Sequence, residues 1–224
     1  MWPTEQNRQA WEGRYAPGPA AARLPDAVRE RLPDLQGKHV LHLPCGGGEV
    51  AAELIRLGAL VTGVDRDERV LAAARELAPD AAFFQAELYE LPLQFRRGRF
   101  DLVYAGEGTV ASIPDLGPFL SGLAAALRKN GRLILHDWHP VAACIEPVEL
   151  RWRESYFSED LWRLGQIVGA VAGTGLALEE LEELPPPPSE AGGRLDPRLP
   201  TYFLLRAAKT EPSQPPPRRK RAQP

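Results

Sequence analysis

The stretch VLHLPCGGGEVA, residues 40–51, decides the fold. Its first half is a short apolar run, typical of a buried strand, and its second half has the pattern of a helix start. The three glycines between them allow a sharp turn and a close approach to a ligand, because no Cβ atom stands in the way. The first turn of the helix presents free N–H groups at the same place, and these favour a negative or polar ligand group.

Asp65 follows a second apolar run and lies 19 residues after Gly46. In open α/β sheets a carboxylate in this place accepts hydrogen bonds from ribose hydroxyl groups. Together the glycines and Asp65 predict a site for an adenosine-type ligand. A purely structural alternative is a tight turn followed by an aspartate that caps the next helix. Residues 46–51 also satisfy G-x-G-x-x-A, so this motif alone leaves a nicotinamide cofactor open.

Outward from this centre, apolar runs alternate with helical patterns. We expect strands at residues 38–43, 59–64, 81–85, 100–104, 132–136, 176–184 and 201–207, and helices at 6–15, 26–35, 50–57, 67–77, 114–128 and 159–171. Strands that alternate with helices predict a parallel sheet with right-handed crossovers, the doubly wound α/β class. Residues 185–200 are rich in proline and are expected to form a surface loop.

Composition fits one globular domain with appendages, because 44% of the 224 residues are hydrophobic and 25% are charged. We expect an N-terminal helical lid over residues 1–36 and a single α/β domain over residues 37–208. Within that domain, an insert for the acceptor is expected at about residues 141–160. Residues 209–224 are expected to be a disordered, basic, proline-rich tail.

Several classes of protein are disfavoured. Two cysteines, Cys45 and Cys144, are too few for a disulfide framework, and neither has a second cysteine at metal-ligand spacing. No apolar run is long enough to span a membrane, and the N-terminus lacks a signal-peptide pattern, so we expect a cytoplasmic protein. Outside the basic tail the chain is acidic, which makes nucleic acid an unexpected partner. We expect a monomer or homodimer with no metal site.

Five segments, taken in order, resemble the motifs of the class I methyltransferases that use S-adenosylmethionine. They are residues 40–48, 61–65, 84–87, 100–103 and 128–133. The resemblance covers roughly residues 38–140 and implies a mostly parallel, seven-stranded, Rossmann-like sheet. Residues 41–45, the pair His139-Pro140 and the leading segment 7–11 are similar to the branch that acts on small molecules.

The resemblance implies S-adenosylmethionine as cofactor and a small-molecule acceptor as partner. By it, the loop 46–48 lies against the methionine part, Asp65 holds the ribose, Glu87 accepts from the adenine amino group, and Leu88 donates its backbone N–H to the ring. The full set of expected cofactor contacts is Cys45, Gly46, Gly48, Asp65, Arg66, Glu87, Leu88, Gly106 and Glu107. Two positions depart from the family pattern: His42 stands where an acid is usual, and Pro44 where glycine is usual.

Candidate residues for chemistry follow the fourth and fifth strands. His139 is the first candidate for a general base, because an imidazole titrates near neutral pH. Alternatively, it hydrogen-bonds the backbone and fixes a turn with Pro140. Asp137 is a second candidate base, or a cap of the same turn.

Aromatic side chains are the candidates for holding the acceptor. Trp152 and Tyr156 lie in the insert, where they suit a flat or apolar acceptor. Trp11 is expected to close over the site from the N-terminal helix, or to be ordinary packing of that helix.

Two further functions stay open at this point. A nicotinamide-dependent oxidoreductase would use the same crevice and would bind NADH. A non-catalytic S-adenosylmethionine-binding protein is favoured by His42 and Pro44, and would bind the cofactor without turnover.

Overall fold

A seven-stranded sheet organises the computed structural model, which describes residues 23–106, 108–146, 151–159, 161–186 and 198–210. The strands of this sheet are β1 (His39–Leu43), β2 (Leu60–Asp65), β3 (Ala82–Gln85), β4 (Phe100–Ala105), β5 (Leu127–Trp138), β8 (Ala177–Leu184) and β9 (Tyr202–Ala208). A separate short hairpin is formed by β6 (Ile145–Glu146) and β7 (Arg151–Trp152). The helices are α2 (Asp26–Arg29), α3 (Glu49–Arg56), α4 (Glu68–Leu77), α5 (Leu116–Ala126), α6 (Pro140–Ala143) and α7 (Leu164–Gly173), with the 3-10 turns η1 (Leu88–Glu90) and η2 (Val110–Ser112).

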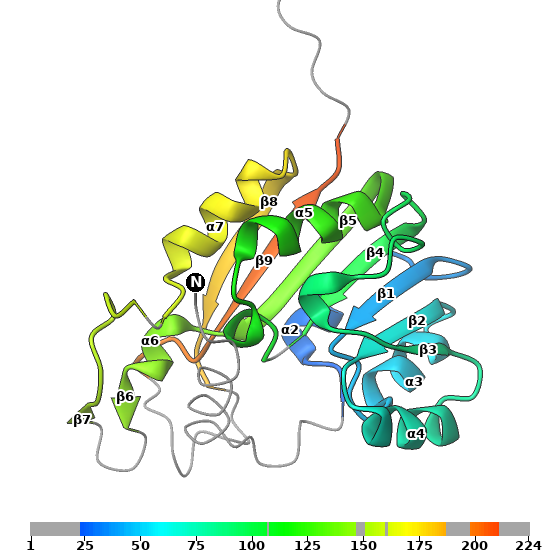
Figure 1. Cartoon of the computed structure of the whole chain (residues 1–224), viewed down its shortest axis with the longest axis horizontal. Coiled ribbons are helices and arrows are strands. Elements are labelled where there is room, and N and C mark those ends of the chain that lie inside the picture. Colours follow the sequence, from blue (N-terminus) through cyan, green and yellow to red (C-terminus); the bar gives the residue numbers. More distant parts are fainter. Residues whose placement is uncertain (1–22, 107, 147–150, 160, 187–197, 211–224) are drawn as a thin grey trace, which may run out of the picture.

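The strand order is β3-β2-β1-β4-β5-β9-β8 (Figure 1). Strands β1 to β5 are parallel to their neighbours, while β9 runs antiparallel between β5 and β8. The expected doubly wound, mostly parallel, seven-stranded sheet is therefore confirmed. The chain first adds β2 and β3 on one side of β1, and then adds β4 and β5 on the other side. Open α/β sheets bind ligands at such a switch point, in the crevice at the carboxyl ends of the strands.

Helices cover both faces of the sheet (Figure 1). One apolar core joins α2, α3 and α4 to alternate side chains of the strands, among them Val40, Val61 and Leu102. The other core joins α5 and α7 to the intervening side chains, such as Leu41 and Val103. The two-residue period of the strands thus divides each apolar run between the two cores.

Three expected elements differ clearly in extent. The helix expected at 159–171 begins only at Leu164 and ends at Gly173. The helix expected at 26–35 ends at Arg29, and Pro33 lies only four residues further on, where it cannot donate a helical hydrogen bond. The fifth strand begins at Leu127, within the segment expected to end a helix, because Leu127 pairs with Phe100 of β4. The backbone irregularity that follows contains Asn130 with a positive φ of 61°.

Some expectations lie outside the described residues. These are the helix at 6–15 with Trp11, most of the proline-rich loop 185–200, and nearly all of the tail from 209 on. Within the described part of the chain, no helix is long and apolar enough to cross a membrane.

Candidate functional site

The glycine loop, residues 45–48, joins β1 to α3 at the carboxyl end of the sheet. Gly48 has a φ of +92°, and a Cβ atom there would lie 2.9 Å from the Cα of Ala74 on α4, so only glycine fits. A Cβ atom on Gly46, which has a φ of +53°, would meet no atom of the described residues within 4 Å. The loop is therefore packed tightly against α4 on one side, and no described residue packs against Gly46 on the other.

Asp65 at the end of β2 holds this loop. Its Oδ2 accepts the N–H of Gly46 at 3.0 Å, and its Oδ1 accepts the N–H of Asp67 at 3.2 Å. The N-cap of α4 is Asp67, whose side chain accepts from Arg69 N, so Asp65 is not the helix cap. A carboxylate has about four lone-pair sites, so Asp65 keeps capacity for ligand hydroxyl groups while it fixes the loop.

Cys45 is buried and packs as a small apolar residue. Burial raises the pKa of its thiol to about 12, with a further rise from the carboxylate of Asp65. Its backbone N–H donates to the carbonyl of Val64 at 3.0 Å, which ties the glycine loop to β2. The thiol therefore stays protonated near neutral pH and does not contribute charge to the site.

Glu87 and Leu88 follow directly beside Asp65. The N–H of Ala86 donates to the carbonyl of Asp65 at 3.0 Å, so the chain enters η1 next to the end of β2. Glu87 is the N-cap residue of η1 and is exposed. The N–H of Leu88 has no acceptor inside η1, because it belongs to the first turn. An acceptor and a donor thus lie together at this edge. Arg66 follows Asp65, and its carbonyl accepts from the side chain of Gln85 at 3.0 Å.

His42 forms the floor of the site on β1. It is 4% exposed, and its ring stacks on Tyr104 of β4 with ring centroids 5.1 Å apart and planes 7° apart. Burial lowers the pKa of His42 to about 3, so the ring is neutral near pH 7. Its Nδ1 is buried and has no hydrogen-bond partner among the described residues. Nε2 lies 3.8 Å from the position that a Cβ atom on Gly106 would take.

Burial of neutral histidines predicts acid sensitivity. The pKa values of His42 and His136 are lowered by burial to about 3 and about 4, below the unfolded value of 6.5. The unfolded chain therefore takes up protons that the folded chain does not, and stability present above pH 6.5 is lost as the pH falls. Between pH 6.5 and its pKa in the folded chain, each histidine lowers the free energy of unfolding by about 1.4 kcal/mol for each unit by which the pH falls.

Asp137 acts in the opposite direction, because burial raises its pKa from 3.8 to about 6. Its ionised form is disfavoured in the folded chain, so stability rises as the pH falls from 6 towards 4. The net expectation is a loss of about 2 kcal/mol in the free energy of unfolding between pH 7 and pH 5, measured by urea titration. His42→Leu should remove most of that loss, whereas His39→Gln, a change at an exposed histidine, should retain it. Equal pH slopes for the two variants would show that His42 is not the group concerned.

Asp137 anchors the loop that follows β4. It is 1% exposed, and its Oδ1 accepts the N–H of Gly108 at 2.8 Å and that of Trp138 at 2.7 Å. Its Oδ2 accepts the N–H of Val110 at 2.7 Å. With three backbone donors on a buried carboxylate, Asp137 fixes the segment from Gly106 to η2 rather than facing an acceptor.

His139 also makes structural contacts with both ring nitrogens. Its Nδ1 accepts the N–H of Val141 at 3.1 Å and so caps α6, while its Nε2 lies 2.8 Å from Oε1 of Glu183 on β8. Burial lowers the pKa of His139, and the Glu183 carboxylate opposes that effect. A role as general base would require the bond to Val141 to break, so the structure places His139 in the turn that the alternative reading describes.

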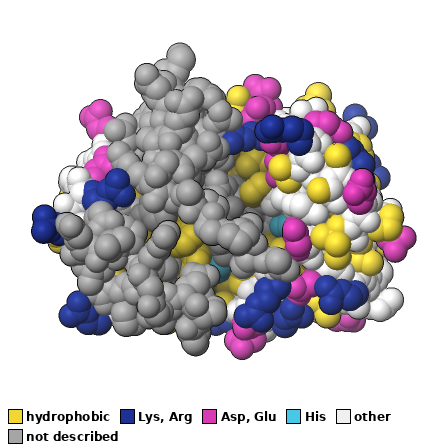
Figure 2. Space-filling view, turned by 90° about the horizontal axis from the view of Figure 1, so that it is seen from below, with side chains coloured by type: hydrophobic (Ala, Val, Ile, Leu, Met, Phe, Trp, Pro, Cys, Tyr) yellow, Lys and Arg dark blue, Asp and Glu magenta, His cyan; other side chains and the backbone are white. Residues whose placement is uncertain are grey.

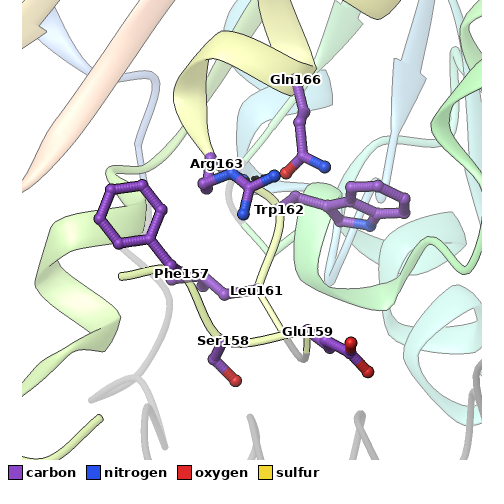
Figure 3. Close-up of a pocket in the computed structure, with 7 residues that line it drawn as sticks. All are labelled: Phe157, Ser158, Glu159, Leu161, Trp162, Arg163 and Gln166. Atoms are coloured by element: carbon purple, nitrogen blue, oxygen red, sulfur yellow. Dashed lines mark hydrogen bonds between the residues drawn. The ribbon is translucent and has the colours of Figure 1, made fainter. Parts of the chain in front are cut away.

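The insert after β5 contains a hollow of about 410 Å³ (Figure 3). Its lining includes Phe157 and Trp162, whereas Trp152 on β7 is 68% exposed and Tyr156 is half-buried, and neither lines it. The hydroxyl of Tyr156 accepts the N–H of Leu164 at 3.1 Å, which supports the start of α7. Neither Trp152 nor Tyr156 lines this hollow, and four of its seven lining residues follow the expected insert: Leu161, Trp162, Arg163 and Gln166.

Seen from below, hydrophobic and histidine side chains are visible in a few small areas, and many charged side chains lie nearer the rim (Figure 2). The carboxyl edge of the sheet brings together Cys45, Gly46, Gly48, Asp65, Arg66, Glu87, Leu88 and Gly106. Glu107 and Trp11 lie outside the described residues. In the described ranges, no group of three or more His, Cys, Asp or Glu side chains is arranged to hold a metal ion.

Sequence reasoning missed Thr109 and Glu183. Thr109 is fully buried, and its hydroxyl donates to the carbonyl of Gly106 at 2.6 Å, which shapes the loop after β4. Glu183 lies in a strand that contains two adjacent pairs of glutamates, a composition that indicates a solvated face. Only the pairing of β8 with β9 brings it to His139, so no local pattern could have revealed that contact.

These residues fit an adenosine-type cofactor that carries an amino acid end. No described residue packs against Gly46, so a ligand can approach the backbone, and Asp65 and Glu87 offer acceptors for hydroxyl and amino groups. The orphaned Nδ1 of His42 is the kind of buried polar atom that requires a partner. Fold and site together define a doubly wound α/β protein with a nucleoside-type ligand site at the carboxyl ends of its first strands.

Comparison with known proteins shows which proteins this chain is similar to. Residues 41–135 match the model of a methyltransferase domain. A ubiquinone biosynthesis O-methyltransferase of Bradyrhizobium diazoefficiens is 35% identical over 148 residues, which cover 59% of this chain and 55% of that protein. The segment from β1 to β5 is therefore similar to a methyltransferase domain. The chain spans about half the length of the curated relatives that it matches.

Solved structures show the same fold. An S-adenosylmethionine-dependent methyltransferase of Mesorhizobium loti aligns with a TM-score of 0.67 at 24% identity, over 82% of this chain and 96% of that one. A similar protein of Listeria monocytogenes, described as a putative S-adenosylmethionine-dependent methyltransferase, aligns with a TM-score of 0.71 at 21% identity, over 83% and 96%.

Proposed function

We propose that this chain catalyses methyl transfer from S-adenosylmethionine to a small-molecule acceptor. The observation that carries the proposal is the bond from Gly46 N to Asp65, which holds the glycine loop beside the carboxyl end of β2. The alignment with methyltransferases over the segments that build this loop supports the same activity.

Each cofactor contact has a role in the proposal. The backbone of residues 45–48 and Gly106 faces the methionine part, and the neutral ring of His42 offers its unpartnered nitrogen there. Asp65 accepts from the ribose hydroxyl groups, and Glu87 with the N–H of Leu88 binds the adenine. Arg66 lies next to Asp65 and covers the ribose side.

When bound, S-adenosylmethionine supplies an electrophilic methyl group on a positively charged sulfur. The contribution of this chain is then to hold the acceptor in line with that methyl group, from which much of the rate of such transfers comes. Asp137 is saturated by backbone donors, and His139 is held between Val141 and Glu183. We therefore propose that Asp137 and His139 position the loops after β4 and β5, and that neither takes the acceptor proton.

Calorimetric titration with S-adenosylhomocysteine tests this proposal, with NADH as a parallel ligand. We expect saturable binding of S-adenosylhomocysteine alone, because Asp65 and Glu87 suit adenosine and the matching domain is that of methyltransferases. Binding of NADH alone would make the chain an oxidoreductase. Turnover is measured as the transfer of a labelled methyl group from S-adenosylmethionine to candidate acceptors. Binding of S-adenosylhomocysteine without transfer to any acceptor would indicate a non-catalytic binding protein.

A further inference from the structure

His42 is a buried polar side chain without a hydrogen-bond partner in the described part of the chain. It is 4% exposed, and neither ring nitrogen bonds to a described residue. Its ring is held by stacking on Tyr104, with ring centroids 5.1 Å apart. Buried polar groups without a partner are rare in folded proteins, and a bound ligand would supply the missing one.

The two ring nitrogens of His42 have different surroundings. Nδ1 is fully buried, whereas Nε2 lies on the side of Gly106, 3.8 Å from the position that a Cβ atom on that residue would take. Because burial lowers the pKa of His42 to about 3, the ring is neutral and carries one proton. Orphaned N–H donors are rarer in protein interiors than orphaned acceptors, so the proton belongs on Nε2. His42 therefore presents an N–H donor towards the loop that begins at Gly106.

The chain ties this donor to the glycine loop. The N–H of Gly106 donates to the carbonyl of Leu43 at 2.9 Å, so the loop after β4 lies against the strand that carries His42. Cys45, three residues after His42, begins the glycine loop, and no described residue lies within 4 Å of the Cβ position on Gly46. A ligand group placed between Gly46 and Gly106 therefore lies next to His42.

The start of α3 adds donors on the other side of the same loop. This helix is eight residues long, and its N-cap residue, Gly48, has no side chain that could accept from the first turn. The N–H groups of that turn have no acceptor within the helix, and the helix dipole favours a negative group there. Donors therefore border the glycine loop at both of its ends, His42 before it and α3 after it.

The described carboxylates near the loop have other contacts. Asp65 accepts the N–H of Gly46, and Asp137 accepts three backbone N–H groups. Glu49 lies against Gly47, with its Oε1 2.9 Å from the position of a Cβ atom there. An amino acid end carries both an ammonium group and a carboxylate. The ammonium group needs acceptors, whereas the carboxylate needs donors of the kind that His42 and α3 provide.

We infer that His42 binds the carboxylate of the cofactor's amino acid end through its Nε2–H, and that it does not bind the ammonium group. The inference rests on the proposed function, because it assumes a ligand that has an amino acid end. It adds a residue that determines specificity, and it states which group of the ligand that residue recognises.

Calorimetric titration with three ligands tests the inference: S-adenosylhomocysteine, its decarboxylated analogue and its deaminated analogue. His42→Phe keeps a flat ring against Tyr104 and removes the donor. We expect this variant to weaken the binding of S-adenosylhomocysteine and of the deaminated analogue by at least about tenfold each, because both carry the carboxylate. Binding of the decarboxylated analogue should change by less than about twofold. Other charged residues near the loop, including Glu107 next to Gly106 in the sequence, are present with all three ligands and cancel in each comparison.

Two further variants at the same position keep the test independent of how well phenylalanine fits. His42→Gln places an amide N–H near the position of Nε2 and should recover most of the affinity for the two ligands that carry a carboxylate. His42→Asp introduces a negative charge, so it should weaken the deaminated analogue most and the decarboxylated analogue least. Glu49→Gln is the matched control, because it removes a carboxylate beside the same loop, and it should leave the order of the three affinities unchanged.

The pattern across the three ligands decides the outcome. Equal weakening of all three by His42→Phe would overturn the inference, because His42 would then only support the loop. Selective weakening of the two ligands that carry the ammonium group would overturn it as well, because His42 would then bind that group. Either pattern would leave the proposed function standing, since S-adenosylhomocysteine would still bind the unmodified chain. If the unmodified chain bound none of the three ligands, the proposed function would fail, and the inference with it.

Discussion

Asp137→Asn should lower the free energy of unfolding by about 2 kcal/mol, because the amide has one acceptor oxygen where the carboxylate has two, so a buried backbone N–H is left without an acceptor. The amide NH₂ group would face the N–H of Gly108 or of Val110, and a donor cannot satisfy a donor. The backbone between β4 and η2 should also become more mobile, because its N–H groups lose a hydrogen-bond acceptor. Urea unfolding followed by circular dichroism measures the loss of stability, and hydrogen exchange at residues 108–110 measures the loosening.

Asp115→Asn is the matched control for that prediction. Asp115 is the exposed N-cap of α5, and its Oδ1 accepts the N–H of Gly117 at 3.0 Å. Asparagine caps helices about as well as aspartate, so this variant should lose only a few tenths of a kcal/mol. If both variants lost the same small amount, the bonds to Asp137 would contribute little to stability.

Asp65→Ala should weaken the binding of S-adenosylhomocysteine by about 2 kcal/mol, which raises Kd about thirtyfold. Two effects add in the same direction. The ligand loses its charge-assisted acceptor, and the N–H of Gly46 loses the bond that fixes the glycine loop. Asp65→Asn should recover part of the affinity, because its amide oxygen can still accept from Gly46. Calorimetric titration of both variants gives the comparison.

Asp67→Ala separates ligand binding from helix capping. Asp67 lies two residues further along and caps α4 through its bond from Arg69 N at 2.9 Å. Its removal should cost about 1 kcal/mol of stability and leave Kd unchanged. An Asp65→Ala variant that bound as tightly as Asp67→Ala would show that Asp65 has only a structural role.

Local patterns were sufficient for the part of the site near the glycine loop. The apolar run before Gly46 and the position of Asp65 predict where β1 and β2 end. Because the two strands are parallel, their carboxyl ends lie at the same edge of the sheet. The doubly wound class also followed from alternation of strands and helices, whereas the strand order and the antiparallel place of β9 were not predicted. The bounds of β1, α3 and β2 accordingly fall within one or two residues of those expected.

Long-range pairing determined what the sequence could not show. The start of β5 at Leu127 depends on Phe100, and the helical pattern before it continues without a local stop signal. His139 has the composition of a catalytic base, but its partner Glu183 comes from a strand 44 residues further on. Which aromatic residues face the hollow depends on how Tyr156 supports α7, and such a contact leaves no periodic signature.

The position of β9 determines when the sheet can be completed during synthesis. β9 lies between β5 and β8, and its residues Phe203, Leu204 and Leu205 are fully buried in both cores. β8 is made earlier but has no neighbour in the sheet until β9 emerges, so a nascent chain that ends before residue 202 exposes one side of β5. Such an edge is a template for pairing with another chain. Among the described residues, the strand made last is the one that closes the sheet, so we expect a chain halted before residue 202 to aggregate more readily than the finished chain.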